Sequence, residues 1–440
     1  YKRDDFVHYQ ENINTNSYDS ELIDFFKANN YLRAKDRCLK MMDRVDLYGL
    51  FNRLDREAVF NKLCIWLLKE ILDSEAEFLI MSENAHSHAQ YLVYEVCDYL
   101  NLEIAKFNDW GSITPLIFLQ NVKTGLKYKT KTKYPKEIKK NILRDINIHI
   151  DSLINRKANQ IYLPTYLKFQ WKKNFKGNFY KILIANLKNN LFLFRKVFDK
   201  NLYNINPNRI NVFQLWKIFN EREANLKRYC KINSVKANFD CKFVYFPLHF
   251  EPERTTNPDG GFFHDQFLAL VYLRKMLPKE VKIYVKEHPT QFKSIKRGIN
   301  GRSPLFYSLI KGIDQVYLID INTDTYLLTK LSLFVASITG TAAREAAIMG
   351  KKALIFGDAW FNECPNIFKW HNNLKFDQIM NNKVADKNEI LDYLKNEMET
   401  YAIPGCQNIS SQKLFKNYLD KEFSEAEFEG IYDLIKTFLK

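Results

Sequence analysis

The chain has 440 residues, of which 46% are hydrophobic and 27% charged. This length exceeds one ordinary hydrophobic core and predicts two domains, and the composition is that of a globular protein. No apolar run approaches the roughly 20 residues that a membrane-spanning helix needs. We therefore expect no transmembrane helix.

The net charge of +15 belongs to one segment. Residues 121–200 carry 20 Lys and Arg against 4 Asp and Glu, a net charge of +16, which leaves −1 for the rest of the chain. A basic surface with interleaved aromatic residues suits an anionic bilayer or a nucleic acid. A set of solvated, lysine-rich helices is the plainer alternative.

Seven cysteines are scattered along the chain without any Cys-x-x-Cys pair: Cys38, Cys64, Cys97, Cys230, Cys241, Cys364 and Cys406. A disulfide framework or a zinc site needs clustered spacing. The sequence therefore predicts core thiols in a reducing, cytoplasmic setting and no metal site.

The N-terminal part begins with helical periodicity over residues 17–73, where apolar residues recur at steps of three and four. A short strand at Phe78–Met81, a helix at about Ser87–Leu100 and a second strand at Glu103–Phe107 follow. This strand–helix–strand order is typical of a parallel α/β sheet.

Residues 121–232 lack the strand pattern and read as a mostly helical basic insertion. Within it, Lys127–Lys140 is expected to be exposed. The polar stretch Lys227–Asn238 is the predicted linker to the second half of the chain.

From Phe239 onward, five short strands alternate with helices. The expected strands are Cys241–Pro247, Val281–Val285, Val316–Ile319, Leu333–Ser337 and Ala353–Phe356. The expected helices are Asp265–Met276, Pro304–Lys311, Thr323–Lys330 and Ala342–Met349. This rhythm predicts a doubly wound sheet, whose ligands lie beyond the carboxyl ends of the strands.

One or two amphipathic helices are expected in residues 411–440. The predicted organisation is an acceptor-binding α/β domain over residues 1–232, with the basic insertion at about 121–232. A nucleotide-sugar-binding Rossmann-like domain follows over residues 233–410. The C-terminal helices of residues 411–440 are expected to pack back on the first domain.

The most informative motif runs from Ser337 to Gly357, where an apolar strand ends in the turn Ser337-Ile338-Thr339-Gly340-Thr341 and a helix of small residues opens at once. Backbone N–H groups, hydroxyls and the positive end of a helix would surround one point, which suits a phosphate. Glu345, one turn into the helix, could accept both hydroxyls of a ribose. A well-capped helix with Thr339 or Thr341 as N-cap is the alternative.

Together with Phe243–Thr256, Asp259-Gly260-Gly261 and Tyr284–Pro289, this motif resembles the capsule polysaccharide biosynthesis family, which includes bacterial Kdo transferases of the GT-B type. The match covers about Phe239–Phe361. The resemblance implies two Rossmann-type domains that face an interdomain cleft. It also implies a CMP-linked donor of Kdo or another 2-keto sugar acid, without a metal or other cofactor.

The resemblance further implies that the His288-Pro289 pair helps to hold the CMP phosphate, with Lys286 nearby. The donor-binding residues expected on these grounds are Lys286, His288, Pro289, Ser337, Thr339, Gly340, Thr341, Glu345, Thr255, Gly260 and Gly261. Positive charge or hydrogen-bond donors at a leaving phosphate are what this chemistry needs.

Three residues are candidates for catalysis: Glu253, Glu83 and His288. Glu253 falls on the acidic motif after the first strand of the second domain. If Glu253 only orients the donor, Glu83 is the alternative base, with His86 and His88 beside it as acceptor-binding residues. A carboxylate can act as general base in an inverting reaction or as nucleophile in a retaining one.

The expected activity is transfer of a sugar to a bacterial surface glycan, such as capsule polysaccharide or lipopolysaccharide, or to a lipid-linked acceptor. The basic segment then predicts a peripheral protein at the cytoplasmic face of the inner membrane. A CDP-glycerol-type polyol-phosphate transferase and a nucleotide-sugar 2-epimerase are the enzymatic alternatives. A basic nucleic-acid-binding protein is the non-enzymatic one, and nucleic acid is not the expected partner.

Overall fold

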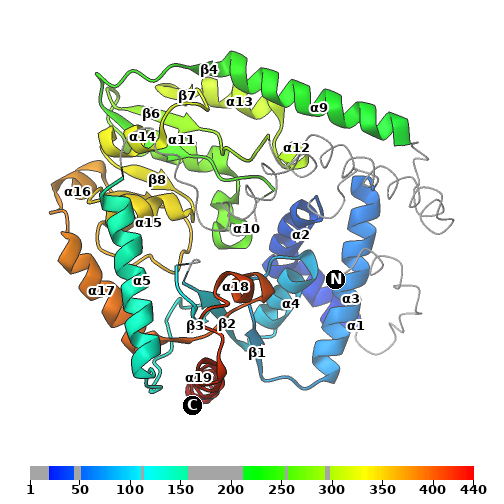
Figure 1. Ribbon diagram of the computed structural model, residues 1–440. Coiled ribbons are helices and arrows are strands. Elements are labelled where there is room, and N and C mark those ends of the chain that lie inside the picture. The colour runs from blue at the N-terminus through cyan, green and yellow to red at the C-terminus, as the bar shows by residue number, and fades with distance from the viewer. Residues whose placement is uncertain (1–18, 44–50, 111–112, 157–211, 253–255, 293–297) are drawn as a thin grey trace.

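The computed structural model describes residues 19–43, 51–110, 113–156, 212–252, 256–292 and 298–440. Within these ranges the chain forms two sheets, and helices cover both of them (Figure 1). The predicted α/β class and the two-sheet organisation are confirmed.

The first sheet has four strands in the order β1-β2-β3-β11. These are β1 (Phe78–Met81), β2 (Glu103–Asp109), β3 (Leu116–Asn121) and β11 (Ala402–Pro404). β1 and β2 are parallel, as expected of a strand–helix–strand unit, whereas β3 pairs antiparallel with both β2 and β11. Only one strand pair of this sheet therefore follows the parallel Rossmann pattern.

Helices surround the first sheet because its side chains are apolar on both faces. The N-terminal helices, which enclose a core of their own, are α1 (Asp19–Lys27), α2 (Asn29–Met42), α3 (Arg53–Asp73) and α4 (His88–Tyr99). α19 (Lys421–Phe438) covers one face through Leu434, which packs with Phe107 and Ile403. α5 (Lys136–Ile154) and α17 (Lys387–Tyr401) pack against Leu116 and Phe118 of β3.

The second sheet has seven strands, all parallel, in the order β10-β9-β8-β5-β6-β7-β4. Its strands are β4 (Ser234–Val235), β5 (Phe243–Pro247), β6 (Lys282–Lys286), β7 (Val316–Ile319), β8 (Val335–Ser337), β9 (Ala353–Ile355) and β10 (Ile367–Lys369). Its helices include α9 (Val212–Asn233), α11 (Gln266–Met276), α13 (Pro304–Lys311), α14 (Thr325–Leu331), α15 (Thr341–Ile348) and α16 (Phe376–Asn381). Five of the strands lie where the sequence predicts them.

The linker expected at Lys227–Asn238 is wrong. α9 continues through Asn233, and β4 then adds a strand to the edge of the second sheet. Leu226 and Cys230 on α9 are buried in the core of that sheet, and this burial holds the polar stretch in a helix. Of these two residues only Cys230 lies within the expected linker, where lysines and asparagines hide the helical pattern.

The C-terminal part returns to the first sheet through α17 and β11, before α18 (Ile409–Leu414) and α19. α19 lies against β3 and β11, beside the C-terminus in Figure 1. The predicted boundaries at residues 232 and 410 stay predictions, and β11 already belongs to the first sheet before residue 410.

The predicted core thiols are confirmed, since all seven cysteines are free and five of them are buried. Among the described helices none combines the length and apolarity that crossing a bilayer requires. Of the basic segment, only residues 121–156 lie in the described ranges. There, Lys127 belongs to the stretch expected to be exposed, but its side chain is only 8% exposed and pairs with Glu397 of α17.

Candidate functional site

The topology of the second sheet marks one switch point at its carboxyl edge. From β5 the chain adds β6 and β7 on one side, and then β8, β9 and β10 on the other. The switch in direction therefore falls between β5 and β8, which is where open α/β sheets bind their ligands. The turn Ser337–Thr341, expected to hold a phosphate, lies at this switch.

His249 and Ser337 join the carboxyl ends of β5 and β8 at this switch point. His249, two residues beyond β5, places its Nε2 3.1 Å from Oγ of Ser337 at the end of β8. The amide of Gly340 donates to Ser337 Oγ at 3.2 Å, and the amide of Thr339 approaches the same Nε2 at 3.5 Å. Because Nε2 accepts in this pattern, His249 in its neutral form carries its proton on Nδ1.

Gly340 is required by this packing. A Cβ at this position would lie 2.6 Å from Ser337 Oγ and 3.1 Å from Cε1 of His249. Gly340 is also the N-cap of α15, which begins without a side-chain capping bond, so neither Thr339 nor Thr341 caps it as the alternative had it. The positive end of α15 therefore lies at the switch point without a side-chain capping oxygen.

Glu345 lies one turn into α15, as the sequence places it, and is partly buried. Burial raises the pKa of Glu345 above its usual range, against the charges of Arg344 and Arg156. Arg156 follows α5, so the first half of the chain reaches the helix that begins at the switch point. In Figure 1, α5 runs along the side of the molecule toward α15.

His288, two residues beyond β6, is held as a neutral imidazole. Thr290 supplies two contacts to its Nδ1, the hydroxyl at 2.7 Å and the amide at 3.3 Å. Nδ1 is therefore the acceptor, and Nε2 carries the proton. Burial lowers the pKa of His288 to about 3, and the charges of His249, Arg302 and Lys286 act in the same direction.

A buried ion pair anchors the loop that carries His288. Arg302 Nε lies 3.1 Å from Glu287 Oε2, and the hydroxyl of Tyr307 donates to the same oxygen at 2.7 Å. Glu287 Oε1 accepts the backbone amide of His288 at 2.7 Å. Arg302 also donates to the backbone carbonyl of His249 at 2.8 Å. One guanidinium thus fixes both histidine-bearing loops.

Lys286, two residues before His288, directs its Nζ to the loop after β7. Its Nζ donates to the carbonyl of Thr323 at 2.5 Å and to Oγ1 of Thr325 at 3.0 Å, so it braces the loop between β7 and α14. Burial lowers the pKa of Lys286 to about 8. Pro289 beyond His288 is exposed.

The two glycines after β5 have conformational and packing roles. A Cβ on Gly260 would lie 2.5 Å from the carbonyl oxygen of Thr256 and 3.0 Å from Ile338. Gly261 has a φ of +56°, in the left-handed region that favours glycine. The geometry accounts for both glycines without a ligand.

Asp259 joins the two halves of the chain. Its Oδ1 lies 3.1 Å from Nζ of Lys106 on β2, with both side chains largely buried, and its Oδ2 accepts from Asn84 in the loop after β1. Burial raises the pKa of Asp259 although Lys106 lies against it. Asp259 belongs to the motif Asp259-Gly260-Gly261 but was assigned no role of its own, and Lys106 carried no signal, so only their pairing across 153 positions reveals this contact.

The candidate acceptor side lies next to this contact. Glu83 is the neighbour of Asn84, and His86 and His88 flank Ser87, the N-cap of α4. The loop that carries these residues therefore contacts the part of the chain that forms the second sheet, at Asp259. Glu253 and Thr255 lie outside the described residues, and the convergence of Glu253 with the other site residues stays a prediction.

The sequence reasoning missed His249 and Arg302. His249 stands within the quoted stretch Phe243–Thr256, at the end of a predicted strand, which was the available signal. Arg302 carried no signal, because its role depends on pairing with Glu287 and on reaching back to the loop after β5.

Comparisons with known proteins add the following. No family model and no curated protein matches the chain. Among solved structures, the KpsC beta Kdo 2,7 transferase of Thermosulfurimonas dismutans aligns over 88% of this chain and 90% of its own, with 12% identity and a TM-score of 0.33. The UDP-GlcNAc 2-epimerase of Methanocaldococcus jannaschii aligns over 77% and 79%, with 13% identity and a TM-score of 0.26. Likeness at this level does not assign an activity to the chain.

Proposed function

We propose that the chain is a glycosyltransferase that binds a nucleotide sugar at the switch point between β5 and β8. The observation that carries this proposal is the joint presence, at the topological switch, of His249 bonded to Ser337 and of the uncapped first turn of α15. Amides at a helix start favour an anion, and the Nε2–H of a neutral imidazole such as His288 supplies a directed donor at a phosphate.

The proposed donor is a CMP-linked sugar, with Kdo or another 2-keto sugar acid as the transferred group. The motif resemblance around Phe243–Thr256 and His288-Pro289 supports this choice. His288 supplies Nε2–H to the leaving phosphate as a neutral donor, and Glu345 takes the ribose hydroxyls. Thr255 and Thr341 complete the donor site, and no metal or other cofactor takes part.

A carboxylate must take the proton of the acceptor hydroxyl as the new bond forms. Glu253 is the first candidate. Glu83 is the second, supported by the contact that its loop makes with the second unit through Asn84 and Asp259. His86 and His88 are proposed to contact the acceptor.

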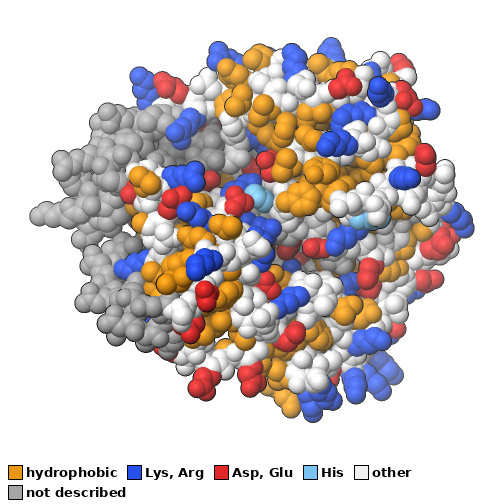
Figure 2. All heavy atoms as spheres, turned by 180° about the vertical axis from the view of Figure 1, so that it is seen from behind, with side chains coloured by type: hydrophobic (Ala, Val, Ile, Leu, Met, Phe, Trp, Pro, Cys, Tyr) orange, Lys and Arg blue, Asp and Glu red, His pale blue; other side chains and the backbone are white. Residues whose placement is uncertain are grey.

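The proposed acceptor is a bacterial surface glycan or a lipid-linked glycan, which places the protein at the cytoplasmic face of the inner membrane. Residues 121–200 would attract the anionic lipid. In the described part of this segment, some lysines form ion pairs with α17: Lys127 pairs with Glu397 and Lys139 with Glu399. Figure 2 shows basic and acidic side chains interspersed over one face of the described residues. Sedimentation with anionic vesicles that weakens with salt is the expected result, and salt-independent or absent binding would remove the membrane from the proposal.

The decisive experiment is a thermal-shift series with CMP, CDP, UDP and GDP. A ligand that binds only the folded protein at about 100 times its Kd adds about 2.7 kcal/mol to the free energy of unfolding. We expect CMP to raise the Tm most. The variant Gly340→Ala, whose Cβ would press on Ser337, should lose this shift. Gly312→Ala is the matched control, because Gly312 lies after α13 with an ordinary helical backbone.

Donor turnover then separates the enzymatic alternatives. Release of CMP from CMP-Kdo supports the proposal, whereas turnover of CDP-glycerol assigns a polyol-phosphate transferase. Conversion of UDP-GlcNAc without an acceptor assigns a 2-epimerase. The absence of a thermal shift with every nucleotide would contradict a nucleotide-sugar enzyme. If nuclease removes co-purified RNA and nucleotide-sugar binding is unchanged, a nucleic-acid-binding protein is contradicted.

A further inference from the structure

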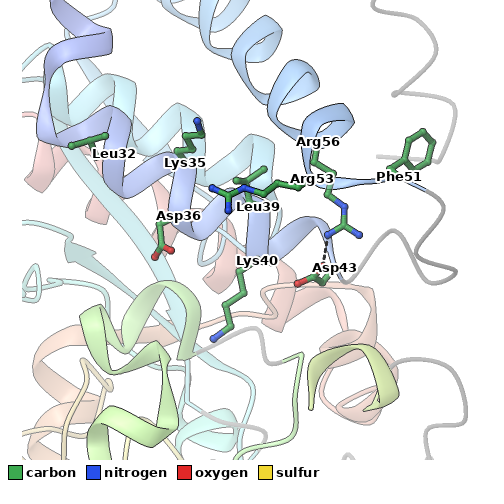
Figure 3. Close-up of a pocket in the computed structure, with 9 residues that line it drawn as sticks. All are labelled: Leu32, Lys35, Asp36, Leu39, Lys40, Asp43, Phe51, Arg53 and Arg56. Atoms are coloured by element: carbon green, nitrogen blue, oxygen red, sulfur yellow. Dashed lines mark hydrogen bonds and ion pairs between the residues drawn. The ribbon is translucent and has the colours of Figure 1, made fainter. Parts of the chain in front are cut away.

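A hollow lies on the N-terminal helices, away from the switch point between β5 and β8. It has a volume of about 680 Å³ and lies between α2 and the start of α3 (Figure 3). Its lining consists of Leu32, Lys35, Asp36, Leu39, Lys40, Asp43, Phe51, Arg53 and Arg56. Four of these side chains are cationic and two are acidic, so the wall is basic on balance.

The cations are arranged around the hollow by neighbouring carboxylates. Arg56 pairs with Asp43, the contact drawn in Figure 3. Arg53 Nε lies 2.8 Å from Glu57, while 81% of the Arg53 side chain stays exposed. Lys35 Nζ lies 3.7 Å from the same Glu57 oxygen. These contacts orient the cationic groups around the hollow, and the Lys35 side chain stays 30% exposed.

Lys40 connects this hollow to the second sheet. It points from α2 toward the second unit, where its Nζ donates to the carbonyl of His264 at 2.9 Å (Figure 3). Lys40 also lines a smaller cavity of about 250 Å³, which includes Glu251 and Arg302. Arg302 is the residue that holds the loops of His249 and His288. The hollow is thus joined, through one lysine, to the walls of the candidate site.

We propose that the hollow binds an anionic group of the acceptor glycan, a carboxylate or a phosphate. This group would lie on a sugar of the glycan remote from the reacting hydroxyl. Arg53 and Lys35 supply the charge-assisted hydrogen bonds, and guanidinium groups match the planar geometry of such anions. Leu32, Leu39 and Phe51 offer apolar surface to the C–H faces of sugar rings. This assignment rests on the proposed function and names its acceptor class as an acidic glycan.

The test uses the full chain and the double variant Lys35→Gln/Arg53→Gln, since the exposure of Arg53 and the partial exposure of Lys35 let the fold persist. Binding is measured by calorimetry with a sialic acid trimer as the carboxylate probe, a short polyol-phosphate oligomer as the phosphate probe and maltotriose as the neutral probe. The control variant Lys27→Gln/Lys69→Gln removes the same charge from α1 and α3 outside the hollow.

We expect an acidic probe to bind more tightly than maltotriose, and the double variant to weaken that probe about threefold to tenfold, because exposed charged contacts contribute little each. The control variant should bind like the unaltered chain. Which acidic probe binds decides between carboxylate and phosphate. Equal binding of maltotriose, or equal weakening in the control variant, would overturn the assignment. The double variant should show the same CMP thermal shift as the unaltered chain, because the hollow is not part of the nucleotide site. If the unaltered chain itself shows no CMP shift, the proposed function fails, and this outcome is distinct from failure of the hollow assignment.

Discussion

The imidazole Nε2 of His249 lies 3.1 Å from the hydroxyl of Ser337, and this contact joins the loop after β5 to the end of β8 across 88 positions of sequence. The contact stands at the topological switch of the second sheet. It explains why a glycine is needed at position 340, and it places the start of α15 beside an imidazole whose orientation is fixed.

The first prediction concerns this contact. We expect Ser337→Ala to weaken CMP binding roughly threefold to tenfold, since a typical hydrogen bond contributes about 1 kcal/mol. His249→Ala should cost more, because it also leaves the amide of Thr339 and the hydroxyl of Ser337 without their acceptor. Calorimetric titration with CMP measures both variants. Equal affinity in His249→Ala and the unaltered chain would exclude His249 from the nucleotide site.

The second prediction concerns pH. The pKa of His288 is about 3 in the folded chain, against an ordinary value of 6.5. Below pH 6.5 the unfolded chain therefore binds a proton that the folded chain does not. The contribution of His288 to stability is complete above pH 6.5 and is lost progressively as the pH falls toward 3.

Denaturant unfolding at pH 7 and pH 5 measures this effect. The variant His288→Gln should lose less stability between the two pH values than the unaltered chain does. His371→Gln is the control, because His371 is exposed and solvated in both states, and it should behave like the unaltered chain. An imidazole of His288 that titrates between pH 6 and 7 in NMR spectra would contradict the buried, neutral state.

The third prediction concerns the buried pair of Arg302 and Glu287, whose side chains are 3% and 0% exposed. Removing one partner leaves a buried charge, which costs about 3–5 kcal/mol. We expect Arg302→Met to lower the free energy of unfolding by that amount, whereas Arg302→Met/Glu287→Gln should recover part of the loss. Urea unfolding measures both, and equal stability of the single and double variants would show that the pair is not coupled.

The fourth prediction concerns the joint between the two units. Lys106→Met should leave the carboxylate of Asp259 buried without its cation and destabilise the contact by about 2–4 kcal/mol. Adding Asp259→Asn should restore much of this loss. Small-angle scattering and limited proteolysis report whether the units separate in Lys106→Met. Lys123→Met, which loses a half-exposed pair with Asp98, is the control and should leave both readouts unchanged.

Local patterns were sufficient for much of the second sheet. Val316–Ile319 and Pro304–Lys311 have the predicted bounds, because alternating short apolar runs and helical periods are written into consecutive residues. The turn at Ser337–Thr341 was found for the same reason, since its hydroxyls and glycine directly follow a strand.

The tertiary structure decided what depends on residues far apart in the chain. The sequence pattern did not predict β11, because β11 has only three residues and is stabilised by pairing with Ile117 and its neighbours in β3. β3 was likewise not predicted. α9 replaced the expected linker because two buried side chains outweigh a polar composition. His249, Arg302 and Asp259 likewise acquired their roles from partners 88, 15 and 153 positions away. Local periodicity thus determined the elements, and long-range burial and pairing determined which side chains form the site.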